Sequence, residues 1–511
     1  IQLARDSELL IYVQLPRAED VATARRAAAE AGFYGTRIYV EQGDLARLYL
    51  ADNLADALIA TPDSAGLPEA EVLRVLRPQG KAILGGRELV KPIPEGVDDW
   101  SHPYHGPDNN PQSQDRLARG PYLTQFLADP RYAPLPQVAV AAGGRVFKAF
   151  GHIAFKTREE PWLDTLAAFS GYNGTLLWRR EIPAALMVHR NTLIATPTTV
   201  YFGDDQSCKV IDAATGQTRD EIAPPADVAG GTFWKWMALE DGVLYALIGE
   251  QEQRDPVIRM RSTNHGWPWN PLSPGYNQAE HTWGFGRTLL AIDPQTKKIL
   301  WRHQEPEPID SRALCLSHGR IYAFRMGAFL TCLDAKTGQA AWRKTPQNDA
   351  PLFESLGGYL NRQDWRTNWR TTAYLKCSDK VLYFAGPQVA KLVAVAAADG
   401  RVLWEQPYSN YQLVLRDDGL YALSGQVGAE VGMGGQFRPE LSRVPEPSRK
   451  FDPLTGQVLA ELNLGRRACT RPTGAIDAVF CRASGGSTRL DVSSNQWGLI
   501  SPMRAQCQDG V

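Results

Sequence analysis

Six basic residues recur at the same place in a repeated pattern of this chain, and their chemistry suits anion binding. Five of them lie a similar short distance before a β-forming aromatic cluster of the Val-Tyr-Phe or Leu-Tyr-Ala kind, and Arg504 fits the start of a further repeat. The six residues are Arg190, Lys235, Arg312, Arg370, Arg471 and Arg504. Two further repeats have Gln137 and Gln412 at this place. The planar fork of arginine fits carboxylate, sulfate or phosphate, so the sequence predicts an anionic ligand where these side chains meet. The alternative is that each arginine pairs with a local carboxylate, such as Asp310, Asp364 or Asp477, and only pins its loop.

Histidine and tyrosine near these residues are candidates for chemistry. His189 adjoins Arg190 and could act as a general base near neutral pH, with Tyr104 as its acid or base partner. His102, His105 and Asp108 could ligate a divalent metal. A structural role is the alternative for His189, and hydrogen bonding to the repeats is the alternative for the His-x-x-His pair.

Aromatic side chains surround the basic positions. Trp236 follows Lys235 directly, and Trp369 precedes Arg370. Aromatic faces beside arginine and asparagine suit sugar rings, which predicts an acidic saccharide as the ligand. The alternative is that each tryptophan covers a long loop.

A repeat must position all of these residues. Each copy has an apolar run, an acidic or polar turn, Thr-Gly or an equivalent, and often Trp, as in LAAFSGYNGTLLW ending at Trp178 and LTCLDAKTGQAAW ending at Trp342. Such repeats predict the blades of a β-propeller over 135–511, because a blade buries its faces only against its neighbours. Seven blades are complete in the sequence and an eighth begins at Arg504, which favours an eight-bladed ring, with seven blades as the alternative. Residues that begin the innermost strands face the central channel from one rim, where the basic side chains should converge.

The first part of the chain differs. Residues 1–90 alternate strand-like and helix-like segments, which predicts a small α/β domain with a parallel, Rossmann-like sheet. Residues 91–134 are dense in Pro, Asn, Asp and Gln and predict an irregular linker packed on the propeller surface.

Composition excludes some classes of function. A net charge of -1 gives no reason to expect nucleic acid as a partner. No apolar run is long enough to span a bilayer. The chain opens at Ile1-Gln2-Leu3, without Met or a basic leader, so we expect a cut or processed end. The seven Cys lack the Cys-x-x-Cys spacing of a zinc ribbon. Buried thiols are expected, with a Cys469–Cys507 disulfide as the alternative in an oxidising compartment.

The repeats resemble those of pyrroloquinoline-quinone-type propellers, best at Ala291–Trp301 and Leu333–Trp342. The resemblance implies the fold but not the cofactor, since the same repeat occurs in scaffold propellers of outer-membrane assembly. Quinoprotein dehydrogenases typically have two adjacent Cys at the quinone, and no two Cys are adjacent here. The whole arrangement, with DDWSHPYHGPDNN, is similar to large propeller proteins of planctomycete bacteria, which implies export, for example to a periplasm.

Residues 1–90 resemble the second half of class I S-adenosylmethionine methyltransferases, at Ala51–Asp56 and Glu71–Gly80. The glycine-rich cofactor turn of that family is missing, and Gln14 stands where the family has an acidic residue. The resemblance therefore implies a remnant that binds no S-adenosylmethionine.

Three functions remain open from the sequence. The first is a propeller that binds an anionic small molecule or glycan, with lyase-type cleavage as its catalytic form. The second is a quinone-dependent oxidoreductase. The third is a non-catalytic assembly module, with a protein partner or a further C-terminal segment completing the last blade.

Overall fold

The computed structural model describes most of the chain and separates it into two compact units. The described residues are 1–61, 66–122, 136–151, 157–184, 186, 188, 190–252, 284–357, 373–386, 388–425, 446–464, 466, 471–482 and 487–500. Unit 1 comprises Ile1–Glu95 with two short later segments, and unit 2 comprises the rest of the chain. Each unit is described by itself.

Unit 1 has two small sheets and three helices. The helices are α1 (Gln2–Asp6), α2 (Ala18–Glu30) and α3 (Glu69–Val75). The strands are β1 (Ile11–Leu15), β2 (Ile38–Gln42), β3 (Ala55–Ala60), β4 (Leu76–Leu84) and β5 (Arg87–Val90). The pairs β1–β2 and β3–β4 are parallel, with a helix between the strands of each pair, whereas β5 pairs antiparallel with β4. Alternating strands and helices thus give parallel pairing, but the described strands form two sheets rather than one.

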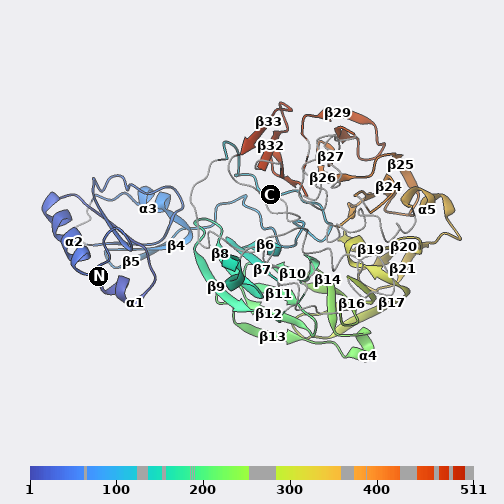
Figure 1. Ribbon diagram of the computed structural model, residues 1–511, viewed down its shortest axis with the longest axis horizontal. Helices are drawn as coiled ribbons and strands as arrows, with labels where there is room; N and C mark the ends of the chain where they lie inside the picture. Colours follow the sequence, from blue (N-terminus) through green and yellow to red (C-terminus); the bar gives the residue numbers. More distant parts are fainter. Residues whose placement is uncertain are drawn as a thin grey trace. The chain divides into compact units, whose positions relative to one another are not determined.

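Unit 2 contains seven four-stranded antiparallel sheets, which follow one another around a ring in chain order (Figure 1). The first three sheets are β6 (Pro136–Ala142) to β9, β10 to β13, and β14 to β17. Their remaining strands are β7 (Arg145–Phe150), β8 (Thr165–Ser170), β9 (Leu176–Glu181), β10 (Leu193–Ala195), β11 (Thr199–Gly203), β12 (Cys208–Asp212), β13 (Thr218–Ile222), β14 (Phe233–Glu240), β15 (Val243–Gly249), β16 (Phe285–Ile292) and β17 (Ile299–Asp310).

The other four sheets are built in the same way. Their strands are β18 (Leu314–Ser317), β19 (Arg320–Arg325), β20 (Phe329–Asp334), β21 (Ala340–Lys344), β22 (Leu375–Cys377), β23 (Val381–Phe384), β24 (Leu392–Ala396), β25 (Val402–Gln406), β26 (Tyr411–Arg416), β27 (Gly419–Ser424), β28 (Ser448–Phe451), β29 (Val458–Leu462), β30 (Thr473–Gly474), β31 (Ala478–Arg482), β32 (Ser487–Asp491) and β33 (Trp497–Ile500). Short helical turns join some of them, namely η1 (Thr157–Trp162), η2 (Arg190–Thr192), α4 (Ala226–Ala229), η5 (Ser311–Ala313) and α5 (Ala350–Leu356).

The acidic residue of the repeat shapes the turn between the third and fourth strands. Asp334 Oδ1 accepts hydrogen bonds from the Lys336 and Thr337 amides at 3.0 and 2.9 Å. Gly338 then adopts φ 69°, a left-handed conformation that glycine enters without steric cost. The repeat therefore encodes one tight turn per blade.

The tryptophan of the repeat joins four of the described blades to the blade that follows. Trp342 on β21 donates its Nε1–H to the Ala397 carbonyl of the following sheet at 3.0 Å, and its ring lies against Gly400 in the next turn. A Cβ on Gly400 would lie 2.9 Å from Trp342 Cζ3. Equivalent contacts join Trp178 to Ala213 and Gly216, Trp301 to Ala335 and Gly338, and Trp404 to Pro453 and Gly456. We call this contact the tryptophan latch.

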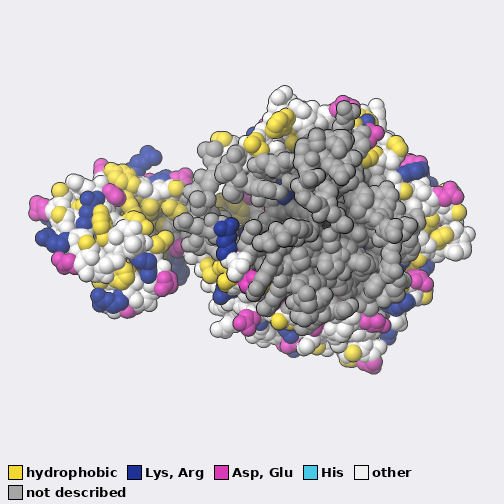
Figure 2. Space-filling model, in the orientation of Figure 1, with side chains coloured by type: hydrophobic (Ala, Val, Ile, Leu, Met, Phe, Trp, Pro, Cys, Tyr) yellow, Lys and Arg dark blue, Asp and Glu magenta, His cyan; other side chains and the backbone are white. Residues whose placement is uncertain are grey.

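The core lies between the sheets. One cluster packs Phe324, Leu330 and Cys332 of one sheet against Leu375, Phe384 and Val393 of the next. Such clusters recur between neighbouring sheets, as expected for blades that bury apolar faces only by stacking. Figure 2 shows basic and acidic side chains mixed along the described rim of the propeller, in keeping with the net charge of -1.

A mainly β chain with many four-stranded sheets was predicted and is confirmed. The eighth blade expected from Arg504 lies outside the described residues. None of the helices in the described part of the chain is both long and apolar enough to cross a membrane.

Candidate functional site

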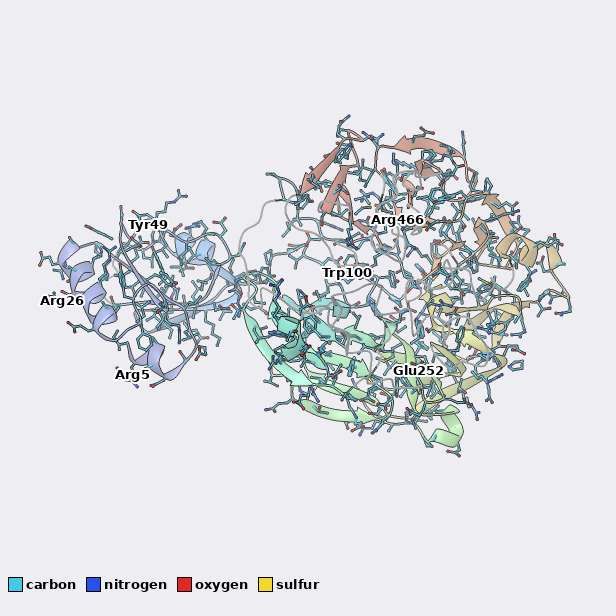
Figure 3. The ribbon with its side chains drawn as sticks, viewed as in Figure 1. Arg5, Arg26, Tyr49, Trp100, Glu252 and Arg466 are labelled. Atoms are coloured by element: carbon cyan, nitrogen blue, oxygen red, sulfur yellow. The ribbon has the colours of Figure 1, made fainter. Side chains whose placement is uncertain are left out.

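A segment preceding the propeller repeats binds the first strand of all seven sheets. The first strand of each sheet surrounds the common axis, so one edge of its backbone faces the channel without a neighbouring strand. Residues 100–113 supply hydrogen-bond partners for these edges, and we call this segment the belt. Figure 3 places Trp100 in the middle of the ring.

The belt contacts the seven strands in chain order. Trp100 exchanges backbone hydrogen bonds with Ala141 of β6, and the Ser101 carbonyl accepts from the Ala195 amide of β10 at 2.9 Å. His102 Nε2 accepts from the Leu239 amide of β14 at 3.0 Å. The Pro107 and Asp108 carbonyls then accept from Leu316 of β18 and Cys377 of β22, at 2.8 and 3.0 Å.

Two asparagines continue this pattern. Asn109 Nδ2 donates to the Leu314 carbonyl at 2.7 Å and the Leu375 carbonyl at 2.9 Å, so one side chain bridges β18 and β22. Asn110 both donates to and accepts from the Leu415 backbone of β26, at 2.9 Å each. The Gly474 amide of β30 donates to the Pro111 carbonyl at 2.7 Å.

Most of these contacts lie near the ends of the first strands, whereas the basic positions lie near their beginnings. The Asn109 side chain also reaches Leu314 and Leu375, the first residues of β18 and β22. Ala141, Leu239 and Leu415 are each the next-to-last residue of a first strand. The belt therefore closes one end of the channel. We call the opposite end, where the first strands begin, the inlet.

Tyr104 is the buried aromatic residue of the belt. Its side chain has no exposed surface, and its hydroxyl accepts from the Ala373 amide at 2.7 Å. The Arg471 guanidinium and the Lys376 ammonium lie over its ring, 4.6 and 4.8 Å from the ring centre. Arg471 Nη1 also donates to the Pro103 carbonyl. Tyr104 was predicted as a catalytic acid or base, but the structure gives it a packing role.

Burial shifts the pKa values of the titratable groups around the belt. Desolvation lowers the pKa of Lys376 to about 7, with the nearby Arg471 adding to the effect, and Lys376 Nζ donates to the Asn109 carbonyl at 2.6 Å. Desolvation also raises the pKa of Asp108 to about 6 and lowers that of His102 to about 3. His102 is therefore neutral at physiological pH, which its acceptor role at Leu239 requires.

The predicted metal site at His102, His105 and Asp108 is not assembled. Both ring nitrogens of His102 are engaged, since Nδ1 lies 2.8 Å from the Ser101 hydroxyl. His105 Nε2 instead pairs with Asp98 at 2.7 Å. No group of three His, Cys, Asp or Glu side chains suited to a metal occurs among the described residues. The two histidines make hydrogen bonds, which was the alternative to a metal site.

Lys235 reaches the inlet through an irregularity in β14. The register against β15 shifts between Trp234 and Trp236, so Lys235 is the extra residue of a β-bulge, which redirects its side chain. Lys235 Nζ lies 2.6 Å from Glu252 Oε1 and 4.1 Å from the centre of the Phe233 ring. Desolvation lowers the pKa of this fully buried lysine.

Arg312 is held by a carboxylate at the start of the fourth sheet. Its Nε donates to Asp310 Oδ1 at 2.8 Å and its Nη2 to Oδ2 at 2.5 Å, a bidentate pair. The Tyr374 hydroxyl donates to the same carboxylate at 2.9 Å, and desolvation raises the pKa of Tyr374. Arg325 lies 4.4 Å from the centre of the Phe285 ring, beside this pair. Arg312 therefore pairs with a nearby carboxylate, which was the alternative given for each arginine.

The inlet and the channel are connected. The Tyr374 amide donates to the Arg312 carbonyl at 3.1 Å, and the adjacent Ala373 amide donates to Tyr104, which carries Arg471 on its ring. The structure thus brings Arg312 and Arg471 to the same part of the channel. Asp477, the predicted partner of Arg471, binds Tyr122 and Arg489 instead.

Other predicted site residues fall elsewhere. Trp236 is 1% exposed and packs in the apolar core between two sheets, so it faces no ligand site. The following lie outside the described residues or have side chains that do: His189, Arg190, Trp369, Arg370, Arg504, Cys469 and Cys507. The five described cysteines are buried and free.

Sequence reasoning missed Asn109, Lys376 and Arg325. Asn109 and Asn110 lie in a Pro-rich segment with the composition of an ordinary loop. Two adjacent asparagines are the only signal there of side chains that hydrogen-bond to the backbone. Lys376 lies in a short apolar strand, where a lone lysine is the signal of a buried polar contact. The linker was expected on the propeller surface, but the belt lies within the ring.

Comparisons with known proteins agree with a propeller of the pyrroloquinoline-quinone type. Residues 286–467 match the family model described as outer membrane protein assembly factor BamB. A curated relative, the quinoprotein alcohol dehydrogenase PedE of Pseudomonas putida, is 27% identical over 124 residues, which are 24% of this chain and 19% of the relative. The chain thus matches about a fifth of the length of that relative.

Solved structures give only distant likenesses. BamB from Moraxella catarrhalis is 12% identical, with 73% of this chain and 87% of that chain covered and a TM-score of 0.38. The quinohemoprotein alcohol dehydrogenase of Comamonas testosteroni is 10% identical, with 79% and 73% covered and a TM-score of 0.45.

Proposed function

We propose that this propeller binds an anionic ligand at the inlet of its channel. One observation carries the proposal: the basic side chains Lys235, Arg312 and Arg471 come from different sheets and are all buried, and Arg471 also contacts the belt at Pro103 and Tyr104. Buried cations cluster at functional sites because placing them there is costly without a purpose.

The carboxylate partners are compatible with this role. The bidentate pair with Asp310 fixes the plane of Arg312 beside Phe285 and Tyr374, and Glu252 fixes Lys235. Groups fixed in this way lose little entropy when a ligand binds. An acidic saccharide is the ligand class that the sequence favours. We propose binding and no cleavage, because Tyr104 is enclosed in the channel.

A quinone-dependent oxidoreductase is the second candidate, favoured by the family match over residues 286–467 and by the PedE relative. Arg312 and Lys235 have the charge that the carboxylates of pyrroloquinoline quinone need. The described residues do not otherwise fit that group, since they include neither a metal-binding cluster nor adjacent cysteines. We therefore derive no redox step.

We further propose that an eighth blade beginning at Arg504 completes the ring, supplied by a further segment or a protein partner. Leu499 on β33 occupies the latch position, yet it is 51% exposed, whereas Trp178 and Trp404 are 9% and 8% exposed. If a sheet packs there, the β33 amides should exchange hydrogen as slowly as those of β21. Fast exchange would contradict the eighth blade.

Calorimetric titration with trigalacturonate, maltotriose and pyrroloquinoline quinone tests the binding function. The double variant Asp310→Asn/Arg312→Gln removes both charges and keeps the hydrogen-bonding shape, so its affinity for the anionic ligand should fall at least tenfold. Arg302→Gln, on the exposed face of β17, is the matched control and should bind like the wild type.

The outcomes separate the candidates. Binding of trigalacturonate but not of maltotriose supports the anionic saccharide. Stoichiometric uptake of the quinone, seen as an absorbance band on the protein, supports the second candidate. If neither anion binds, or if the double variant binds as well as the wild type, the proposed inlet site is wrong.

A further inference from the structure

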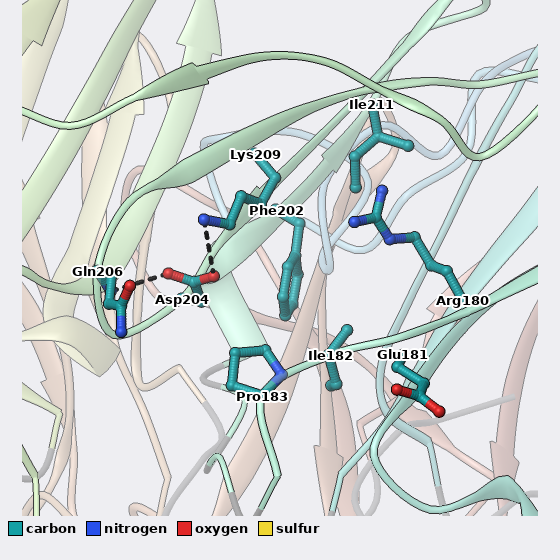
Figure 4. A pocket seen from close by; sticks show the side chains of 9 residues that line it. All are labelled: Arg180, Glu181, Ile182, Pro183, Phe202, Asp204, Gln206, Lys209 and Ile211. Carbon is teal, nitrogen blue, oxygen red and sulfur yellow. Dashed lines mark hydrogen bonds and ion pairs between the residues drawn. The ribbon is translucent and has the colours of Figure 1, made fainter.

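A separate cavity lies between the first two sheets of the propeller, beside the end of β9 (Figure 4). Its volume is about 300 Å³, the lower range for small-molecule sites. The wall consists mainly of the apolar side chains Ile182, Pro183, Phe202 and Ile211. It shares none of its lining residues with the inlet site.

Arg180 supplies the main charge at this apolar wall. Its Nη1 donates to the Gly216 carbonyl at 2.9 Å and to the Thr218 hydroxyl at 2.8 Å, which fixes the guanidinium beside Ile211. No carboxylate of the described chain pairs with Arg180 within ion-pair distance. Desolvation accordingly lowers its pKa, and no acidic neighbour offsets the effect.

The other charged groups near the cavity include an ion-paired cluster of one lysine and two carboxylates. Lys209 Nζ lies 2.5 Å from Glu221 Oε1 and 3.6 Å from Asp204 Oδ2. Asp204 also accepts the Gln206 and Ser207 amides at 2.8 and 2.9 Å. Glu181 also lines the cavity (Figure 4), but among the described residues no ion pair joins it to Arg180. Arg180 is therefore the cation at this wall that lacks a compensating anion.

We propose that this cavity binds a small carboxylate with an apolar or aromatic body. The carboxylate would pair with the half-buried Arg180, and the apolar body would lie against Phe202, Pro183 and Ile182. Such a ligand would supply the anionic partner that Arg180 lacks among the described residues and would cover the apolar side chains of the wall. The Lys209–Glu221–Asp204 group has one cation and two carboxylates, so it gives no reason for a second negative charge on the ligand.

Titration with 3-phenylpropionate tests the proposal, with 3-phenylpropionamide as the neutral analogue. The acid should bind the full-length protein at least tenfold more tightly than the amide. Arg180→Gln should weaken binding of the acid at least tenfold. Arg179→Gln is the matched control, because Arg179 precedes Arg180 on β9 but lies over the Trp162 ring, 4.9 Å from its centre.

The variant Arg180→Lys separates a loss of binding from a folding defect, because it keeps the positive charge but lacks the planar fork of arginine. It should bind the acid more weakly than the wild type and more tightly than Arg180→Gln, at an unchanged thermal midpoint. Equal binding of acid and amide would overturn the proposal, as would an equal loss in Arg179→Gln or no binding of the acid. The Asp310→Asn/Arg312→Gln variant should bind 3-phenylpropionate normally, so this site and the inlet can fail independently.

Discussion

The propeller is joined differently at its rim and at its axis. At the rim, the tryptophan latch repeats, and each copy links one blade to the next through the same indole and the same glycine turn. At the axis, the belt contacts all seven first strands, and the contacts differ in residue and atom from strand to strand. The rim contacts are local and equivalent, whereas the axial contacts depend on one segment placed before the repeats.

The difference has an energetic consequence. A latch holds two neighbouring blades, so its loss weakens one joint of a nearly one-dimensional array. A belt residue satisfies polar groups that face a closed channel, where water cannot replace a lost partner. We therefore expect belt substitutions to cost more than latch substitutions of similar size.

Asn109→Asp should have the largest effect. The change keeps the shape but replaces the donor that bridges the Leu314 and Leu375 carbonyls with a buried carboxylate, which should cost about 4 kcal/mol of unfolding free energy. Denaturant unfolding of the propeller measures the loss. A loss below about 1 kcal/mol would mean that the belt contributes little to stability.

Gly400→Ala should come next and isolates the latch. Its Cβ would meet Trp342 Cζ3 at 2.9 Å, and φ is 75°, so backbone strain and overpacking together should cost about 3 kcal/mol. Gly319→Ala is the matched control. Its φ is 69° and its Cβ meets nothing within 4 Å, so about 1 kcal/mol is expected from strain alone. Equal losses would show that the latch contact itself carries no energy.

His102→Gln should change the pH dependence of stability more than stability itself. The folded pKa of His102 is lowered to about 3, so the unfolded chain binds a proton that the folded chain does not between pH 6.5 and 3. Stability from this residue is thus fully present above pH 6.5 and is lost as the pH falls toward 3. Glutamine can still accept from Leu239 but does not titrate.

Unfolding free energies at pH 7 and pH 4.5 measure the difference. The wild type should lose more stability than His102→Gln over this interval, while the carboxylates contribute equally to both proteins. Parallel losses in the two proteins would mean that His102 is not the acid-sensitive contact of the belt.

The same division between rim and axis separates what the sequence could predict from what it could not. Asp334, Gly338 and Trp342 recur with fixed spacing, and a repeat whose faces need neighbours encodes the blade, its turn and its joint. The belt has no period, because each of its residues meets a different strand. Asn109 and Tyr104 therefore looked like loop and surface residues, although both are buried.

For the candidate site, the sequence could predict which positions carry basic residues but not which residues pair with them. The repeat aligned Lys235 and Arg312 correctly at the beginnings of first strands, but it could not show that Glu252 and Asp310 pair with them. Glu252 lies outside the repeat pattern, and the bulge at Lys235 has no sequence marker. Trp236 was misassigned for the same reason, since the bulge decides which of two adjacent residues enters the core.

Asp220→Asn should have the smallest effect and tests whether every joint is equal. The second sheet carries Asp220 at the latch position, and Lys297 replaces the turn glycine of the third sheet, so an ion pair of 2.5 Å stands where four other joints have an indole on a glycine. Both side chains are more than 40% exposed, and solvent and salt screen such pairs.

Asp220→Asn should leave the denaturation midpoint unchanged, whereas Trp342→Phe, which loses the hydrogen bond to Ala397, should cost about 1 kcal/mol. A loss in Asp220→Asn that equals the loss in Trp342→Phe would show that charge can replace the latch. The rim would then be held by whichever contact spans the joint rather than by the indole.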